Sequence, residues 1–244
     1  MSFFSLKVGQ FLYDYVYPIY QPLYFAYKRY SEKFEIELLR KNIQRGNNVV
    51  DIGANIGFYT RILADIVGEN GKVVAFEPDK INFQKLKDNT KHLKNVVLEN
   101  MAVANHTGNI KLYFSELNVD HRTYPISDTS RCVEIPCVRL DDYFTKNGFI
   151  DFIKIDIQGF EPFAFEGMKN IIQQNRKIKL LSEFWPYGLT KAGSSAEKYY
   201  SELKDYFSKV YLIKDKNLIE LTTDILKELP VSEQQYFNVF CTND

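Results

Sequence analysis

From residue 49 onward, the chain alternates short apolar runs with segments of helical periodicity. The first five expected elements are, in order, a strand at 49–53, a helix at 55–67, a strand at 72–78, a helix at 81–93 and a strand at 95–103. Strands and helices that alternate over short connections form a parallel sheet with helices on both of its faces. The pattern therefore predicts an α/β domain.

The alternation is interrupted once and then resumes. Expected strands at 109–115 and 133–140 flank a polar stretch, 116–132, which has no helical periodicity and is predicted to be a lid over the strand ends. The later expected elements are a strand at 150–157, a helix at 160–175, a strand at 177–184, a helix at 195–207, a strand at 209–215, a short helix near 223–229 and a strand at 235–242. Ser194 and Glu197 are expected to form a capping box at the start of helix 195–207.

Composition limits the classes of partner. The 244 residues suit one α/β domain, residues 46–244, preceded by an extension, residues 1–45. The 31 basic and 31 acidic side chains cancel, so no whole-protein field attracts nucleic acid, and no nucleic-acid partner is expected. Cys132, Cys137 and Cys241 lack metal-binding or disulfide spacing, which favours buried free thiols in a cytoplasmic protein.

The extension is rich in aromatic residues, with eleven Tyr and Phe rings in the first thirty positions. It has neither a basic start nor a small-residue cleavage site, so it does not resemble a signal peptide. Residues 8–27 carry one charge, Asp14, but Pro18, Pro22 and six tyrosines are unfavourable in a membrane-spanning helix. Two interpretations stay open: a pair of helices lying across the domain, or a Tyr-rich surface in peripheral contact with a membrane.

A glycine turn between the first strand and the first helix is the first candidate ligand site. Gly53 and Gly57 suit a tight turn at the carboxyl edge of the sheet, but a dinucleotide fingerprint would need glycines at Asn55 and Phe58. Asp51 would repel a pyrophosphate by about 4 kcal/mol per charge pair at about 4 Å and an effective dielectric of about 20. The same carboxylate attracts the cationic methionyl end of S-adenosylmethionine, either directly or through water.

Glu77 stands twenty residues after Gly57, at the end of the second expected strand. A carboxylate at this position accepts hydrogen bonds from both hydroxyls of a ribose. Nicotinamide binders and adenosylmethionine binders both use it, so Glu77 predicts an adenosyl ligand without choosing between them.

Several motifs in order resemble one known family. They are Asp51-Ile-Gly-Ala-Asn-Ile-Gly57, Phe76-Glu-Pro78, Ala102-Val-Ala-Asn-His-Thr-Gly108, Leu140-Asp-Asp142 and Lys154-Ile-Asp-Ile-Gln-Gly-Phe-Glu161. Together, over about residues 46–242, they look like the successive motifs of FkbM-type S-adenosylmethionine-dependent methyltransferases. The resemblance implies a class I methyltransferase Rossmann-like fold, whose seven-stranded, mostly parallel sheet ends in an antiparallel strand. It also implies O-methylation of hydroxyls on sugars, glycolipids or natural products.

The resemblance also implies roles for individual residues. The cofactor-binding residues implied are Asp51, Gly53, Asn55 and Gly57 at the methionyl end of S-adenosyl-L-methionine, Glu77 at the ribose, and the turn from Asn100 to Ala102 at the adenine. One position departs from the pattern, because Gln158 stands where many relatives have Glu.

The candidate catalytic residues come from three places in the chain. The apolar run 150–157 carries Lys154 and Asp156 near its end, where Asp156 either faces substrate or cofactor, or forms an ion pair or helix cap. Run 177–184 ends in a similar way with Glu183. A hydroxyl acceptor must lose a proton, so His121, Asp156 and Glu183 are the candidate bases. No metal site is expected, although two carboxylates suit magnesium.

Three functions remain in view. The first is an adenosylmethionine-dependent O-methyltransferase, the second a NAD-dependent oxidoreductase, and the third a non-catalytic protein that binds an adenosyl ligand. A small-molecule or glycan acceptor is expected for the first. The side chains that suit such an acceptor are those that stack on or hydrogen-bond to sugars, namely Arg122, Tyr124, Trp185 and Tyr187.

Overall fold

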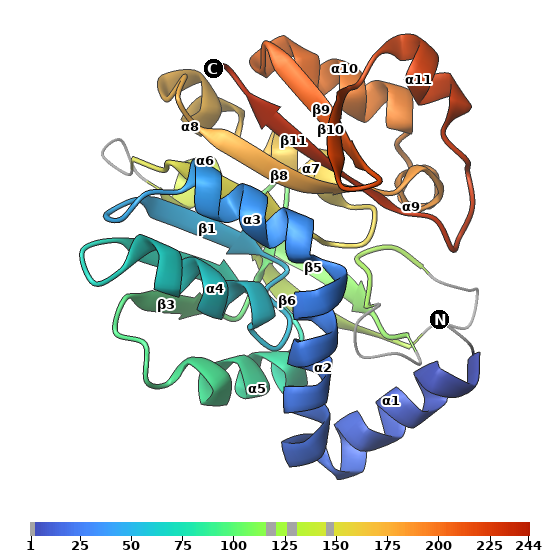
Figure 1. Ribbon diagram of the computed structural model, residues 1–244. Helices are drawn as coiled ribbons and strands as arrows, with labels where there is room; N and C mark the ends of the chain where they lie inside the picture. Colours follow the sequence, from blue (N-terminus) through green and yellow to red (C-terminus); the bar gives the residue numbers. More distant parts are fainter. Residues whose placement is uncertain (1–2, 116–120, 126–130, 145–148) are drawn as a thin grey trace.

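In the computed structural model, residues 3–115, 121–125, 131–144 and 149–244 are described. Within them, the central feature is an eight-stranded sheet. Its strands are β1 (Asn48–Ile52), β2 (Lys72–Phe76), β3 (Val96–Glu99), β7 (Phe152–Ile155), β8 (Lys179–Phe184), β9 (Lys209–Lys214), β10 (Asn217–Glu220) and β11 (Phe237–Thr242). They follow one another across the sheet in the order β10-β9-β11-β8-β7-β1-β2-β3 (Figure 1).

The sheet confirms the predicted α/β architecture. Strands β3, β2, β1, β7 and β8 pair in parallel, and β11 runs antiparallel to both β8 and β9. The expected number of seven strands was one too few, because β10 adds to the edge as an antiparallel partner of β9. The hairpin turns at Asp215 and Lys216, which both have positive φ, as a two-residue hairpin requires. The pair Asp215-Lys216 differs from the Asn-Gly or Asp-Gly pair that usually marks such a turn in a sequence.

Helices cover both faces of this sheet. They are α3 (Lys33–Asn42), α4 (Phe58–Val67), α5 (Lys80–Thr90), α6 (Leu140–Tyr143), α7 (Glu161–Glu166), α8 (Lys169–Gln174), α9 (Pro186–Lys191), α10 (Ala196–Tyr206) and α11 (Thr223–Glu228). Successive strand residues point to opposite faces. Val50 and Ile52 accordingly pack in one core with residues of α7, α8 and α10, whereas Val49 packs in a second core with residues of α3 and α4.

A second, three-stranded sheet corrects the prediction of one strand at 95–103. The chain leaves the main sheet after β3, and Ala102–Val103 forms β4, which pairs with β6 (Cys132–Val138) beside β5 (Gly108–Tyr113). The side chain of Asn100 stabilises the bend by donating hydrogen bonds to the carbonyl oxygens of Glu77 and Pro78. Cys137 of β6 is buried, but Cys132 is exposed, contrary to the expectation of buried thiols.

Two further sequence expectations are corrected near α7 and α10. The helix expected at 160–175 is broken between α7 and α8 at Gly167, where an added Cβ would lie 2.0 Å from the carbonyl oxygen of Ala104. Because Gly167 has no Cβ, its backbone can approach the backbone of Ala104 closely. The cap of α10 is Ser195 rather than Ser194, because the Ser195 hydroxyl accepts the hydrogen bond from the Lys198 amide.

The N-terminal extension is helical, as expected, and consists of α1 (Phe3–Tyr15), α2 (Tyr17–Ser31) and α3. Helix α1 contacts α5, and α2 packs against α4 and α5 (Figure 1). The hydroxyl of Tyr13 donates to the Asn82 side chain, and the Asn89 amide donates to the Tyr17 hydroxyl over 2.7 Å. In the part of the chain that is described, no helix combines the length and the hydropathy needed to cross a membrane.

Candidate functional site

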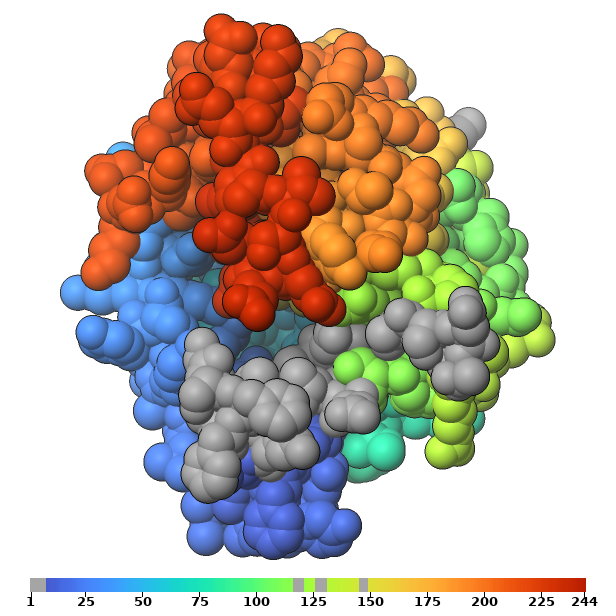
Figure 2. Space-filling view, turned by 90° about the vertical axis from the view of Figure 1, so that its right-hand side faces the viewer, coloured from blue at the N-terminus to red at the C-terminus, as the bar shows by residue number. Residues whose placement is uncertain are grey.

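A cavity of about 1300 Å³ opens at the carboxyl ends of the central strands. Its inner wall comes from the segments that follow β1, β2, β7 and β8, where parallel sheets usually bind ligands. Its outer walls come from α1, α2 and residues 233–238. Figure 2 shows the hollow between the blue N-terminal helices and the red segment near the C-terminus.

The glycine turn after β1 forms one side of the cavity. The amides of Gly53 and Ala54 both donate to the carbonyl oxygen of Phe76, each over 3.0 Å, which ties the turn to the end of β2. Gly53 has a φ of +79°, and a Cβ at this residue would lie 1.9 Å from the carbonyl oxygen of Asp156. Only glycine therefore fits between the β1 and β7 ends.

The four predicted residues of this turn do not all reach the cavity. Gly53 and Asn55 line it, whereas Gly57, with a φ of +90°, begins α4 and is not among the described lining residues. A Cβ on Gly57 would lie 2.8 Å from the Leu86 side chain, so this glycine allows α4 and α5 to pack closely.

Asp51 lies behind the cavity wall instead of in it. Its carboxylate is fully buried, accepts a 2.7 Å hydrogen bond from the Thr60 hydroxyl, and has one oxygen 3.9 Å from the Lys154 ammonium nitrogen. Burial raises the pKa of Asp51, and Lys154 opposes that rise. Asp51 is not among the described lining residues and forms a buried ion pair, because β1 directs residue 51 toward α4. Its role at the methionyl end stays a prediction.

Glu77 lines the cavity directly after β2, as predicted. One carboxylate oxygen accepts a 2.7 Å hydrogen bond from the Asn55 amide, and the other accepts a 2.9 Å bond from the Asp79 amide. Burial raises the pKa of Glu77 to about 8, although these two amides lower it. Each oxygen keeps a further lone pair for a ligand hydroxyl.

Of the residues predicted at the adenine rim, Ala102 lines the cavity together with Met101. Asn100 is not among the described lining residues, since its amide holds the bend described above. Its contribution to the site is the position of the turn.

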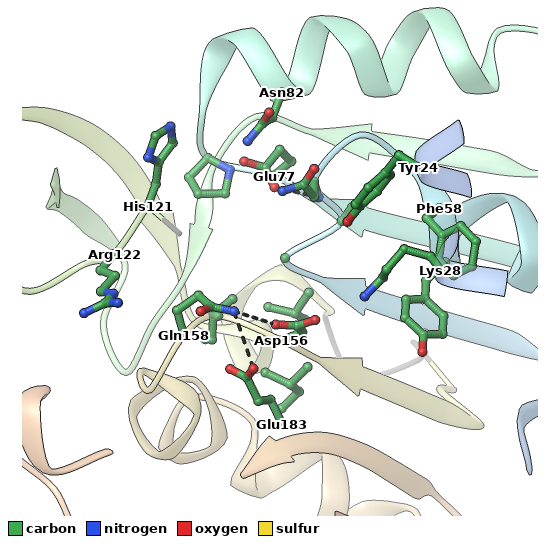
Figure 3. A pocket seen from close by; sticks show the side chains of 18 of the residues that line it. Tyr24, Lys28, Phe58, Glu77, Asn82, His121, Arg122, Asp156, Gln158 and Glu183 are labelled. Atoms are coloured by element: carbon green, nitrogen blue, oxygen red, sulfur yellow. Dashed lines mark hydrogen bonds between the residues drawn. The ribbon is translucent and has the colours of Figure 1, made fainter. Parts of the chain in front are cut away.

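Asp156, Gln158 and Glu183 form a polar cluster at the deep end of the cavity (Figure 3). The Gln158 amide donates to Asp156 over 3.1 Å and to Glu183 over 3.5 Å. A glutamate at position 158 would instead place a third negative charge between two carboxylates. The glutamine therefore allows Asp156 and Glu183 to lie side by side.

The two carboxylates of this cluster have different electrostatic surroundings. Burial raises the pKa of Asp156, but Lys154, 3.3 Å away, and Lys28 outweigh it and hold the pKa below its usual value. Burial, followed by the charges of Asp156 and Glu161, raises the pKa of Glu183 well above its usual value. Glu183 is only 7% exposed, and its Oε2 has no hydrogen-bond partner among the described residues.

Glu161 stabilises the turn that carries Gln158. It is fully buried, and its Oε1 accepts hydrogen bonds from the amides of Ile157 and Gly159. Burial raises the pKa of Glu161 to about 7. Gln158 and Gly159 both have positive φ, so Glu161 stabilises the tight turn that presents Gln158 to the cavity. Sequence reasoning noted Glu161 as part of a motif but assigned it no role.

His121 lies on the opposite side of the cavity from Asp156 and Glu183 (Figure 3). Its Nδ1 accepts a 3.2 Å hydrogen bond from the Ser115 amide, and its ring packs edge-on against Phe114. The neighbouring Arg122 is buried, with its guanidinium 4.9 Å from the Trp185 ring. Most of the predicted lid, 116–132, falls outside the described residues, so only 121–125 and 131–132 of it are placed.

The side chains proposed for acceptor contact are partly brought together. Arg122 and Trp185 line the cavity, and Arg122 also lies 5.7 Å from the Tyr124 ring. Tyr124 and Tyr187 are not among the described lining residues, and the Tyr124 hydroxyl donates to the Gln158 carbonyl oxygen.

Lys28 and Tyr24 of α2 are cavity residues that sequence reasoning missed (Figure 3). Burial lowers the pKa of Lys28 to about 8, and Lys28 forms an ion pair with Glu32. No local pattern marks these residues, because their proximity to Asp156 arises only when α2 folds back over the sheet. Among the described residues, no group of three or more His, Cys, Asp or Glu side chains is arranged to hold a metal ion.

Comparisons with known structures support the fold. The chain is 11% identical to an S-adenosylmethionine-dependent O-methyltransferase from Thermotoga maritima, with a TM-score of 0.50, over 87% of this chain and 64% of that one. It is 13% identical to a candidate rRNA methylase from Clostridium thermocellum, with a TM-score of 0.51, over 85% and 94% of the two chains. A candidate methyltransferase from Streptococcus mutans, solved with SAH, is 12% identical with a TM-score of 0.50, over 85% and 94%.

At these identities the likeness concerns the fold alone, and the chain spans less than two thirds of the Thermotoga protein. A comparison with curated protein sequences finds no match. The family is shown by a different comparison, in which residues 51–210 match the methyltransferase FkbM domain. These residues include the glycine turn, Glu77 and the Asp156–Glu183 cluster. The chain therefore belongs to the FkbM family of S-adenosylmethionine-dependent methyltransferases.

Proposed function

We propose that this methyltransferase acts on a hydroxyl oxygen of a sugar, glycolipid or hydroxylated natural product. The observation that carries the proposal is the carboxylate cluster on the cavity wall, in which Glu183 lines the cavity beside Asp156 and its buried Oε2 has no hydrogen-bond partner among the described residues. A hydroxyl acceptor must lose its proton during methylation, and a carboxylate with a raised pKa suits that task.

The residues present fit the methyl donor of the family. Glu77 offers two oxygens with free lone pairs, Gly53 and Asn55 bring backbone close to the cavity, and Ala102 borders its other side. When bound, S-adenosylmethionine supplies a methyl carbon that is already activated by its sulfonium. The protein therefore has to position the acceptor, exclude water and accept one proton.

Glu183 is the base favoured by its surroundings. Asp156 is held ionised by Lys154 and Lys28, so it is a weak base and suits orientation of a second hydroxyl or of Gln158. His121 stays a candidate, but its Nδ1 is engaged by Ser115 and it lies across the cavity. In the proposed reaction the acceptor hydroxyl gives its proton to the Glu183 carboxylate, and the acceptor oxygen gains the methyl group as the bond between that methyl group and the donor sulfur breaks.

Family membership replaces the NAD-dependent alternative, because the FkbM domain match covers the same glycine turn and Glu77 on which that alternative rested. A non-catalytic adenosyl-binding role is the second candidate. The buried, unpartnered Glu183 oxygen disfavours it, since burial of such a group is costly without a function at the site.

The experiment that tests the proposal combines donor binding with an acceptor screen. Calorimetry is expected to show binding of S-adenosylmethionine and S-adenosylhomocysteine but not of NAD. Nucleotide sugars, glycolipids and aglycones are then incubated with donor, and methylated products are detected by mass and located by fragmentation. Methyl groups found only on nitrogen, sulfur or carbon would contradict the assignment to hydroxyl oxygen.

A further inference from the structure

Helices α1 and α2 present two different faces. One face anchors them to the domain, with Tyr13 under the Lys85 ammonium, Tyr17 bonded to Asn89, and Phe25 packed edge-on against Phe58. The helices are thus part of the folded structure. The other face carries large apolar side chains that are 44% to 85% exposed, at intervals of three or four residues, namely Val8, Phe11, Tyr15, Ile19, Leu23, Tyr27 and Tyr30.

This exposed face continues into the cavity. Phe11, Tyr15, Leu23 and Tyr27 belong to the exposed face and also line the cavity. Across the opening, Tyr236 is 64% exposed and lines it as well. We call these five residues the apolar mouth. Exposed apolar side chains gathered at one place mark an interaction site.

The cavity changes character with depth. The five residues of the apolar mouth are 48% to 76% exposed, whereas the hydrogen-bonding groups of Asp156, Gln158 and Glu183 lie at the strand ends, where Glu183 is only 7% exposed. The volume of about 1300 Å³ also exceeds the roughly 300–1,000 Å³ of a pocket for one small ligand. The space therefore suits a methyl donor and a second molecule that is polar at one end and apolar at the other.

The apolar mouth lies outside the region that the family domain covers. The domain match spans residues 51–210, whereas the mouth comes from residues 11–27 and 236. Donor binding and the carboxylate cluster lie within the shared region. The apolar mouth is therefore formed by segments that flank the matched region on both sides.

We propose that the apolar mouth binds the hydrophobic part of an amphiphilic acceptor, whose hydroxylated end reaches Asp156 and Glu183. This inference rests on the proposed O-methyltransferase function and identifies residues that determine its acceptor. A monomeric amphiphile is the occupant that fits, because the apolar surface leads inward to hydrogen-bonding groups. A flat bilayer or a second copy of the chain would cover the rim and leave the inner polar end unfilled.

The test uses n-octyl β-D-glucoside below its micelle concentration as the probe, and methyl β-D-glucoside as its headgroup control. Binding is followed by calorimetry and by fluorescence of Trp185, which lines the cavity and is the single tryptophan. The octyl compound is expected to bind, and the methyl compound to bind at least tenfold more weakly, because only the first buries a long alkyl chain.

Leu23→Lys is expected to weaken octyl glucoside binding by roughly tenfold or more, since a charge replaces apolar contact surface. The matched control is Leu218→Lys, which makes the same change at an exposed leucine of β10 outside the described cavity lining and is expected to alter binding less than twofold. Circular dichroism and thermal unfolding check that both variants fold. Equal binding of the two glucosides, or an unchanged affinity in Leu23→Lys, would overturn the inference.

Two further measurements separate the alternatives. Flotation with phosphatidylcholine vesicles distinguishes a bilayer from a monomeric amphiphile, and binding to vesicles without binding to octyl glucoside would overturn the inference. Donor affinity is measured in the same proteins. If the wild-type protein does not bind the donor, the proposed function is contradicted. If it binds the donor but not octyl glucoside, only the acceptor inference is contradicted.

Discussion

Replacing Glu77 by glutamine tests how the donor is recognised. The carboxylate accepts one amide hydrogen bond on each oxygen, and both oxygens keep a lone pair toward the cavity. Glutamine has the same shape but only one acceptor oxygen and no charge. At pH 9, where Glu77 is ionised, the variant therefore lacks a charge-assisted acceptor for the ribose hydroxyls, which is worth about 2–3 kcal/mol, or roughly 30- to 150-fold in the dissociation constant.

The pH dependence sharpens this prediction. Burial raises the pKa of Glu77 to about 8, so the carboxyl group is mostly protonated at pH 7 and ionised at pH 9. If the ionised form binds the ribose, the affinity of the wild type should rise over this interval, by at most about tenfold per pH unit below the pKa. Glu77→Gln cannot ionise and should lack this component of the dependence.

Isothermal titration calorimetry with S-adenosylhomocysteine at pH 7, 8 and 9 provides the measurement. Glu99→Gln is the matched control, because Glu99 ends the neighbouring strand β3, accepts a 2.6 Å bond from the Tyr143 hydroxyl and is not among the described lining residues. The affinity of Glu99→Gln for S-adenosylhomocysteine should be within threefold of the wild-type value. A folded Glu77→Gln protein with wild-type affinity at pH 9 would refute the assignment of Glu77 to the ribose.

The same pKa shift affects stability, with a definite sign. The folded pKa of about 8 lies above the ordinary value of 4.5, so the contribution of Glu77 to the free energy of unfolding is full below about pH 4.5 and is lost as the pH rises to about 8. Urea unfolding of the wild type and Glu77→Gln should therefore show the difference in stability moving in favour of the variant between pH 5 and pH 8.

Three other predictions follow from the site. Glu183→Gln should lower turnover by roughly 100-fold with donor affinity unchanged, while His121→Ala should lower it much less; the reverse ranking in steady-state rates would move the base to His121. Lys28→Met removes a cation that lowers the pKa of both Asp156 and Glu183, the proposed base. The acid limb of the pH–rate profile should therefore shift to higher pH, and an unmoved limb would contradict that coupling. Gly159→Ala places a Cβ 2.5 Å from the Gly188 backbone and should lower the free energy of unfolding in urea by about 2 kcal/mol or more. The control Gly46→Ala is also at positive φ but has open space around it, so it should cost only about 1 kcal/mol. Equal losses of stability in the two variants would argue against the close contact at Gly159.

The order of elements and the donor side of the site could be predicted from the sequence. Apolar runs that end in Gly53 and Glu77 are local signals, because the carboxyl ends of adjacent parallel strands meet at the same edge of a sheet. The structure confirms the sheet and places both residues on the cavity. The edge strand β10 was missed because its turn, Asp215-Lys216, lacks the composition of a typical hairpin.

Tertiary structure decided the rest, because it depends on contacts between residues far apart in the chain. The spacing of residues in the sequence does not predict that Asp51 pairs with Lys154 behind the cavity wall. Nor does it predict that the Gln158 amide donates hydrogen bonds to both Asp156 and Glu183. The aromatic extension shows the same limit. Its composition predicted helices, but only their packing on α4 and α5 brings Lys28 and the exposed apolar face to the cavity. Local propensity sets which segments are helices and strands, whereas long-range burial and pairing set which side chains meet.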